Sequence, residues 1–209
     1  MSATLLAAAV APAHAVSLTS ELQALADRLR RVTVRVATTG ARFDGVGAGI
    51  IWPSNGRSLV MTNAHVVPAR RGNRLVVEDD AGHRVDAEVI GRDAERDLAL
   101  LALEEVGDEW PDAARIGDPR ALRAGELVVA LGHPFGVGGA LSLGIVHAAP
   151  KGEDGWVRAD VRLAPGNSGG PLATLDGAIV GINCMIARGL GIAVPAHVAD
   201  RFALEVLAR

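Results

Sequence analysis

A serine flanked by glycines lies toward the carboxyl-terminal end of the chain, where residues 164–172 read APGNSGGPL. Glycine has no Cβ, so the backbone around Ser168 can turn sharply and a substrate carbonyl group can come close. Adjacent backbone N–H groups that point to one spot form an anion-binding nest, which can stabilise an oxyanion. The segment therefore suits a nucleophilic serine, although a plain glycine turn between two strands would use the same residues.

A serine hydroxyl is a weak nucleophile at neutral pH and needs a base, which in turn needs a carboxylate to orient it. The chain offers both groups upstream of the serine. His65 lies in TNAHVV at 62–67, directly after an apolar strand, and Asp97 opens the apolar stretch DLALL at 97–101. The order His65, Asp97, Ser168 along the chain is the order of the chymotrypsin type of serine hydrolase.

Each residue by itself has an ordinary structural explanation. His65 could be a hydrogen-bonded histidine at the end of a strand, and Asp97 could be a polar residue that opens a buried strand. The combination of three local contexts in one order is what favours nucleophilic catalysis over these explanations.

The segments TNAHVV, DLALL and PGNSGGPL resemble the three catalytic blocks of the HtrA/Deg-type, trypsin-like serine peptidases. Residues 47–51 (GAGII) and 131–136 (LGHPFG) also resemble a strand and a turn of that family, and the similarity runs from about Val32 to Pro195. The resemblance implies an all-β chymotrypsin-like fold, with two antiparallel Greek-key six-stranded β-barrels and short N-terminal and C-terminal helices. It also implies a serine endopeptidase of protein quality control or processing, which cleaves protein or peptide substrates through an acyl-enzyme.

The resemblance assigns a role to each residue of the motifs. His65 becomes the general base, Asp97 the carboxylate that orients it, and Ser168 the nucleophile. The backbone N–H groups of Gly166 and Ser168 would form the oxyanion hole, and Asn167 would shape the turn that presents them.

The chain departs from the family pattern in three places. The turn contains His133 where Asn or Ser is usual. Arg162 stands six residues before Ser168, where trypsin-fold enzymes often place the base of the primary specificity (S1) pocket. Too few residues follow Pro195 for the PDZ domain that HtrA proteins generally carry, so we expect no PDZ domain in this chain.

The position of Arg162 allows two interpretations of the substrate pocket. Arg162 could line S1 and favour an acidic residue before the scissile bond (P1). It could instead face solvent or pair with Asp160 on the same strand face. Leu163 and Ala187 would then shape a modest apolar pocket, which favours small or medium apolar P1 residues.

The composition excludes several other classes of protein. The chain has 209 residues, of which 49% are hydrophobic, so it can bury one sizeable core or form two fused small barrels. Its net charge of −3 comes from mixed signs, with no basic patch for nucleic acid. No stretch of about 18 apolar residues predicts a transmembrane helix. The histidines lack metal-ligand spacing and no nucleotide-binding glycine motif is present, so we expect no metal and no cofactor.

Two smaller features have simple expected roles. Cys184 is the single cysteine, which rules out a disulfide within the chain, and we expect it to be a buried small hydrophobe without a catalytic role. Asp79 and Asp80 lie between two predicted strands, and we expect them at a solvated hairpin tip.

The amino-terminal segment allows two interpretations. Residues 1–17 are either a signal peptide or a disordered lead: the apolar run at 4–10 and Ala-His-Ala at 13–15 fit a signal peptide, but no positive charge precedes the run. The first interpretation predicts a periplasmic or secreted protein and the second a cytoplasmic one. Leucines at helical spacing then predict an amphipathic helix over 18–29, capped by Thr19 or Ser20.

The rest of the chain is expected to be one peptidase domain over 18–209. Short β runs separated by turn residues place a first barrel at about 32–103 and a second at about 115–195, followed by a helix at 196–208. About six strands in each half, with no long helix between them, favour antiparallel barrels over a βαβ sheet. A homo-oligomer is possible, but no segment specifies one.

Two further functions use the same motifs. The chain could be a triad-bearing, trypsin-fold binding or chaperone-like module that is inactive until a partner orders the oxyanion loop. It could also be an esterase or a self-processing enzyme with the same three residues.

Overall fold

The computed structural model describes residues 17–39, 45–54, 56–68, 74–104, 106–107, 110–134, 138–152 and 155–209. Within these residues, twelve strands form two closed barrels, and a helix lies at each end of the described chain. The predicted all-β class with two six-stranded antiparallel barrels is confirmed. The expectation of a signal peptide or disordered lead falls on residues 1–16, outside the described part, and on Ser17.

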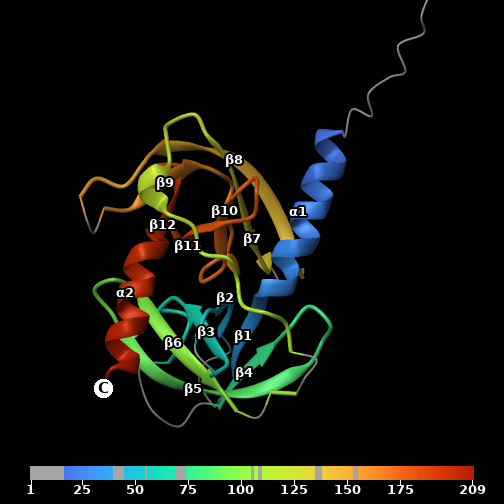
Figure 1. Ribbon diagram of the computed structural model, residues 1–209, viewed down its shortest axis with the longest axis vertical. Helices are drawn as coiled ribbons and strands as arrows, with labels where there is room; N and C mark the ends of the chain where they lie inside the picture. The colour runs from blue at the N-terminus through green and yellow to red at the C-terminus, as the bar shows by residue number, and fades with distance from the viewer. Residues whose placement is uncertain are drawn as a thin grey trace, which may run out of the picture.

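The first barrel lies in the lower half of Figure 1, and its strands run in the order β1-β2-β3-β6-β5-β4. The second barrel, in the upper half, repeats the same order as β7-β8-β9-β12-β11-β10. Closure pairs each of the described strands on both sides, so neither of these two sheets has a free edge among the described residues. The strands are β1 Thr33–Thr39, β2 Gly45–Trp52, β3 Leu59–Thr62, β4 Arg74–Glu78, β5 Arg84–Asp93, β6 Leu98–Leu103, β7 Leu127–Gly132, β8 Ala140–Ala148, β9 Val157–Asp160, β10 Pro171–Thr174, β11 Ile179–Ala187 and β12 Leu190–Pro195.

Strand β3 is buried on both faces, as its unbroken apolar sequence requires. Side chains alternate between the two faces of a strand. Val60 therefore points into the first barrel, where it packs with Val36 and Leu101, while Leu59 and Met61 point outward into a second cluster. That second cluster lies between the barrels and includes Leu131 and Ile182 of the other barrel, so we call it the inter-barrel core.

Both helices extend the inter-barrel core. Helix α1 (Leu18–Val32) buries Leu25 and Leu29 in it and leads directly into β1. Helix α2 (Ala196–Leu207) packs against β11 and β12 of the second barrel and against β5 and β6 of the first, so it spans both barrels in Figure 1. Neither described helix is long and apolar enough to cross a membrane.

The cap predicted for α1 is wrong by two or three residues. Ser17, not Thr19 or Ser20, is the N-cap: its side chain accepts a hydrogen bond from the backbone N–H of Thr19 at 3.3 Å. The helix also continues past the predicted end to Val32. Val32, in the added turn, packs against the inter-barrel core, a tertiary contact that the leucine spacing does not report.

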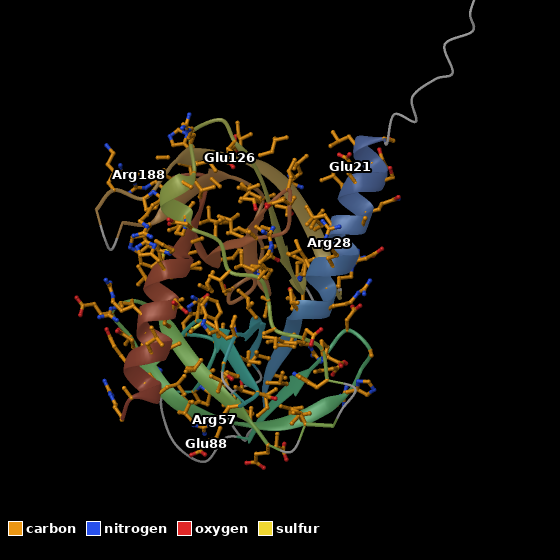
Figure 2. The ribbon with its side chains drawn as sticks, viewed as in Figure 1. Glu21, Arg28, Arg57, Glu88, Glu126 and Arg188 are labelled. Atoms are coloured by element: carbon orange, nitrogen blue, oxygen red, sulfur yellow. The ribbon has the colours of Figure 1, made fainter. Side chains whose placement is uncertain are left out.

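The hairpin between β4 and β5 also differs from expectation. Asp79 is buried, not solvated, and its carboxylate accepts a hydrogen bond from the backbone N–H of His83 at 2.8 Å and contacts His83 Nδ1 at 2.8 Å. Asp80 is exposed as expected. Other charged side chains, such as Arg57, Glu88 and Arg188, lie on the periphery in Figure 2.

We predict that Phe202→Ala in α2 destabilises the protein by about 3–5 kcal/mol, because its buried ring is lost from the inter-barrel core. Urea unfolding followed by circular dichroism measures the change. The matched control is Leu204→Ala in the same helix, which removes a side chain that is 62% exposed and should change stability by less than about 0.5 kcal/mol. Equal effects of the two substitutions would contradict the docking of α2.

Candidate active site

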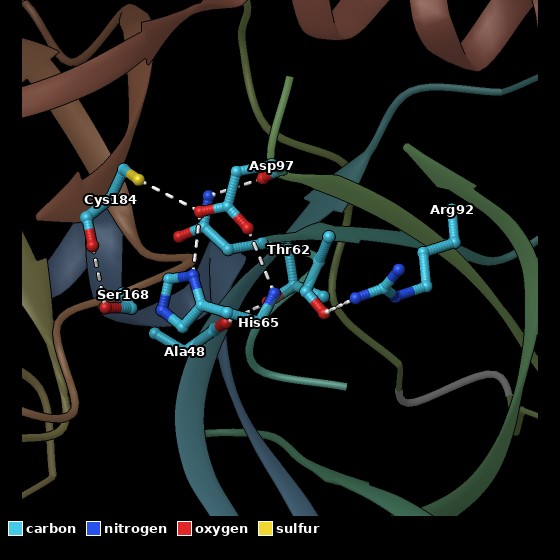
Figure 3. Close-up of polar contacts among 9 residues, drawn as sticks. Ala48, Thr62, His65, Arg92, Asp97, Ser168 and Cys184 are labelled. Atoms are coloured by element: carbon cyan, nitrogen blue, oxygen red, sulfur yellow. Dashed lines mark hydrogen bonds and ion pairs between the residues drawn. The ribbon is translucent and has the colours of Figure 1, made fainter. Parts of the chain in front are cut away.

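The pairing of β3 with β6 brings His65 and Asp97 together. His65 follows the end of β3, and Asp97 immediately precedes the start of β6. The two strands are antiparallel neighbours, with Thr62 opposite Ala99, so these two ends meet at one edge of the barrel. The backbone N–H of His65 donates to Asp97 Oδ1 at 3.0 Å, and its Nδ1 lies 2.7 Å from Asp97 Oδ2 (Figure 3).

The backbone of Asp97 is held in an unusual conformation. Its φ angle is +55°, in the left-handed region that few residues other than glycine occupy and that Asp tolerates better than most. The buried side chain of Asn63 donates from Nδ2 to the backbone carbonyl of Asp97 at 2.9 Å. This bond helps to hold the turn that aims the Asp97 carboxylate at His65.

Cys184 supplies a third donor to Asp97, and sequence reasoning did not find it. Its thiol Sγ lies 2.9 Å from Asp97 Oδ2 and donates to it across the boundary between the barrels. Cys184 is buried, as expected, but it contacts the carboxylate as well as apolar neighbours. Only the relative placement of β11 and β6 creates this contact, and no local sequence signal encodes it.

Hydrogen bonds decide the charge state of Asp97. Burial by itself raises the pKa of Asp97, but the hydrogen bonds from His65 and Cys184, together with the charge of His65, outweigh it and leave the pKa below its usual value. Burial, followed by the bond to Asp97, raises the pKa of the Cys184 thiol. The carboxylate is therefore ionised at neutral pH and the thiol keeps its proton.

Two consecutive turns form the segment around Ser168. In the first, the N–H of Asn167 donates to the carbonyl of Ala164 at 3.0 Å, and Gly166 has a φ of +103°. Pro165 fixes a negative φ at the preceding position, so the turn is of type II. In the second, the N–H of Gly170 donates to the carbonyl of Asn167 at 3.0 Å.

These turns leave two backbone donors without an acceptor among the described residues. Within the described chain, the backbone N–H groups of Gly166 and Ser168 donate no hydrogen bond, whereas the carbonyl groups of both residues are held in place. The Gly166 carbonyl accepts from His133 N–H at 3.0 Å and the Ser168 carbonyl accepts from Ala48 N–H at 2.8 Å. A pair of free N–H groups two residues apart is the arrangement that binds an oxyanion.

His133 supports the turn from behind. Its backbone N–H holds Gly166, and its Nδ1 accepts from the N–H of Gly139 at 3.4 Å. Burial is the largest influence on the side chain and lowers the pKa of His133, which matches an unprotonated Nδ1 that accepts a hydrogen bond. His133, which stands where Asn or Ser is usual, therefore supports the turn around Ser168 from the neighbouring loop.

The Ser168 hydroxyl lies at the mouth of an apolar pocket. Its Oγ donates to the backbone carbonyl of Cys184 at 3.0 Å, and no hydrogen bond joins it to His65 in the part of the chain that the structure describes. The pocket has a volume of about 330 Å³. Its lining consists of Leu163, Ala164, Pro165, Asn167, Ser168, Cys184, Met185 and Ile186.

The structure places the three predicted pocket residues differently from one another. Leu163 is one of the residues that line this pocket. Arg162 is exposed and lies outside the lining, and the described residues show no ion pair between Arg162 and Asp160. Ala187 is exposed near the end of β11 and does not line the pocket; Met185 and Ile186 do. The bulge of β11 after Asn183 changes which side chains face Ser168, and this bulge was not visible in the sequence.

The comparison with protein families gives a match for most of the chain. Residues 47–182 match the trypsin-like peptidase domain. The chain belongs to the trypsin-like peptidase family. That span contains His65, Asp97 and Ser168, together with most of both barrels, and the resemblance predicted from the motifs is confirmed.

Several curated proteins are similar to this trypsin-like chain. It is 32% identical over 177 residues to the periplasmic pH-dependent serine endoprotease DegQ of Escherichia coli, covering 79% of this chain and 38% of DegQ. It is 36% identical over 169 residues to serine protease HTRA1 of Xenopus laevis (76% and 36%). It is 34% identical over 183 residues to the serine protease Do-like HtrA of Bacillus subtilis (79% and 40%). The matched region spans less than half the length of each of these relatives.

We predict that Gly166→Ala destabilises the protein by about 1–3 kcal/mol, because the new Cβ would lie 2.3 Å from the His133 carbonyl oxygen at a φ that disfavours alanine. The matched control is Gly82→Ala, which has a similar φ of +90° but nothing within 4 Å of the new Cβ. The shift in urea midpoint should be larger for Gly166→Ala. Equal shifts would show that the turn is not confined by His133.

Proposed function

We propose that this chain is a serine endopeptidase in which Ser168 is the nucleophile, His65 the general base and Asp97 the orienting carboxylate. The observation that supports it most strongly is that the two barrels each contribute one part of the site. The hydrogen-bonded His65–Asp97 pair belongs to the first barrel, and the Ser168 turn with its free N–H groups belongs to the second. The names of the relatives, which are serine endoproteases, point to the same reaction.

The proposed reaction begins at the Ser168 hydroxyl. A rotation of the side chain takes Oγ from the Cys184 carbonyl to His65 Nε2, which removes the proton as Oγ attacks the substrate carbonyl carbon. Asp97 keeps the other imidazole proton on Nδ1 and stabilises the imidazolium ion that forms. His65 then donates its proton to the leaving amine, which gives the acyl-enzyme.

The free N–H groups of Gly166 and Ser168 would stabilise the negative oxygen of each tetrahedral intermediate. One such donor is worth on the order of 10²–10³ in rate. Neither group donates a hydrogen bond within the described residues, so both are available to a substrate oxygen, which supports this role. Water, activated by His65, would hydrolyse the acyl-enzyme in the second half of the reaction.

The geometry of the turn speaks against the alternative of an inactive binding module. In that alternative the oxyanion turn is collapsed until a partner orders it. The positive φ of Gly166, with both carbonyl groups held by His133 and Ala48, is instead the arrangement that presents the donors. No observation on the described residues favours a second function.

The pocket supports a preference for small or medium apolar residues at P1. Its lining includes no ionisable side chain other than the thiol of Cys184, which keeps its proton. A charged P1 side chain would lose its hydration there without an ionic partner, which is costly. Arg162 is outside the lining and offers no counter-charge inside the pocket.

We predict that a fluorophosphonate probe labels the wild-type protein and not Ser168→Ala, and that this variant loses casein cleavage by on the order of 10⁴-fold or more. The serine is the attacking atom, so the loss should appear in kcat. Ser142→Ala, in β8, is the matched control and should keep labelling. Equal labelling of Ser168→Ala would exclude Ser168 as the nucleophile, and an unlabelled wild type would contradict a ready-formed site.

We predict that peptides with Val, Leu or Met at P1 are cleaved with a kcat/KM at least about tenfold higher than peptides with Glu or Lys. A P1-varied peptide library read by mass spectrometry measures the preference. Arg162→Ala should leave the ranking unchanged, because Arg162 lies outside the pocket. Best cleavage after Asp or Glu, lost on Arg162→Ala, would overturn this view of the pocket.

A further inference from the structure

Cys184 joins the His65–Asp97 pair to form a cluster of three side chains of the types that bind metal ions. The potential ligand atoms of His65, Asp97 and Cys184 all lie within 4.8 Å of one another, the one such cluster among the described residues. The spacing of the histidines predicted no metal site, because these three residues are far apart in the chain and only the fold brings them together. Asp97 Oδ2 is the common centre, 2.7 Å from His65 Nδ1 and 2.9 Å from Cys184 Sγ.

We propose that this cluster binds Zn²⁺ through His65 Nδ1, Asp97 Oδ2 and Cys184 Sγ, and that the bound ion switches the peptidase off. Imidazole nitrogen, carboxylate oxygen and thiolate sulfur are the three ligand types that zinc uses in proteins. A site with three protein ligands leaves a fourth position for water. The inhibition, though not the binding, rests on the proposed peptidase function.

The three ligand atoms need only a small rearrangement to hold the ion. A tetrahedral zinc site has bonds of about 2.0–2.3 Å, so neighbouring ligand atoms lie roughly 3.3–3.6 Å apart. The present separations of 2.7 and 2.9 Å must therefore widen by about 0.6 Å. The His65 side chain can move outward because 49% of its surface is exposed, while Asp97 Oδ1 stays anchored to the His65 N–H.

Zinc binding would redistribute the protons of the site so that His65 can no longer act as a base. Zinc replaces the two protons that now lie against Asp97 Oδ2, from Sγ and from Nδ1. The thiol proton leaves to solvent, since a coordinated thiol is deprotonated. The imidazole stays neutral by exchanging its proton through solvent from Nδ1 to Nε2. An Nε2 that already carries a proton cannot accept the proton of Ser168.

The thiol should make the site selective for soft cations. Thiolate and imidazole ligands favour zinc, whereas Mg²⁺ and Ca²⁺ prefer sites built from oxygen atoms. The hairpin pair Asp79–His83 provides an internal comparison. Its Nδ1 and Oδ2 atoms are 2.8 Å apart, much as in the His65–Asp97 pair, but no cysteine completes a cluster there among the described residues.

The binding is tested first in the Ser168→Ala variant, so that the result does not depend on catalysis. Co²⁺ is the spectroscopic probe, because a cobalt–thiolate bond gives a charge-transfer band in the near ultraviolet. We expect the band to appear with one equivalent of Co²⁺, to vanish on addition of Zn²⁺, and to persist in excess Mg²⁺. Absence of the band at saturating Co²⁺ would overturn the proposal.

Variants then assign the ligands. In the Ser168→Ala variant, the further substitution Cys184→Ser keeps a hydrogen-bond donor to Asp97 but removes the thiol. It should abolish the cobalt band and weaken Zn²⁺ binding by about tenfold or more, and Cys184→Ala should do the same. His83→Gln should leave binding unchanged. Zinc binding that survives both cysteine substitutions, or that is lost in His83→Gln, would place the ion elsewhere and overturn the site.

The inhibition is tested on the wild-type protein with a peptide substrate. Zn²⁺ should suppress cleavage, a chelator should restore it, and Cys184→Ser should need about tenfold more zinc relative to its own zinc-free rate. Equal inhibition of the wild type and Cys184→Ser by Zn²⁺ would overturn the proposed inhibition through this site. A wild type that binds Co²⁺ but cleaves nothing would instead contradict the proposed peptidase function and leave the metal site standing.

Discussion

The apolar layer between the two barrels is the contact on which the rest of this structure depends. Each barrel can close its own hydrogen bonds, but the outward faces of strands such as β3, β7 and β11 are apolar and need a partner. They find it in one another and in the two helices. Burying apolar surface is favourable in proportion to its area, so the two barrels have a strong reason to dock face to face. The Ser168 turn and the His65–Asp97 pair meet because of that docking.

At the site, the backbones of the two barrels come into close contact. A Cβ at Gly169 would lie 2.0 Å from the Ala48 carbonyl oxygen, so the Ser168 segment fits against the first barrel only because it lacks side chains there. Asp97 adopts a left-handed φ at the same junction, held by Asn63. Such conformations cost energy and persist where the surrounding structure fixes them, and both occur here beside the groups that would do the chemistry.

The thiol of Cys184 affects this site in two ways, as a hydrogen-bond donor and as a potential metal ligand. As a weak donor it joins His65 in holding Asp97 ionised, and as a buried group it keeps its proton. The same atom makes the carboxylate the centre of a nitrogen, oxygen and sulfur cluster. One side chain therefore links the second barrel to the orienting carboxylate of the first, and places a soft ligand beside the proposed general base.

The sequence by itself determined the local elements and the identity of the motif residues. Short β runs separated by turn residues predicted the strands of both barrels, and the PGNSGG segment predicted a tight turn around Ser168, because these features depend on neighbours in the chain. Tertiary structure decided the rest. Packing against the inter-barrel core extended α1 to Val32, a bulge in β11 put Met185 and Ile186 in the pocket instead of Ala187, and docking brought Cys184 to Asp97. These contacts join residues far apart in sequence, and only the packing of the two barrels sets the distances between them.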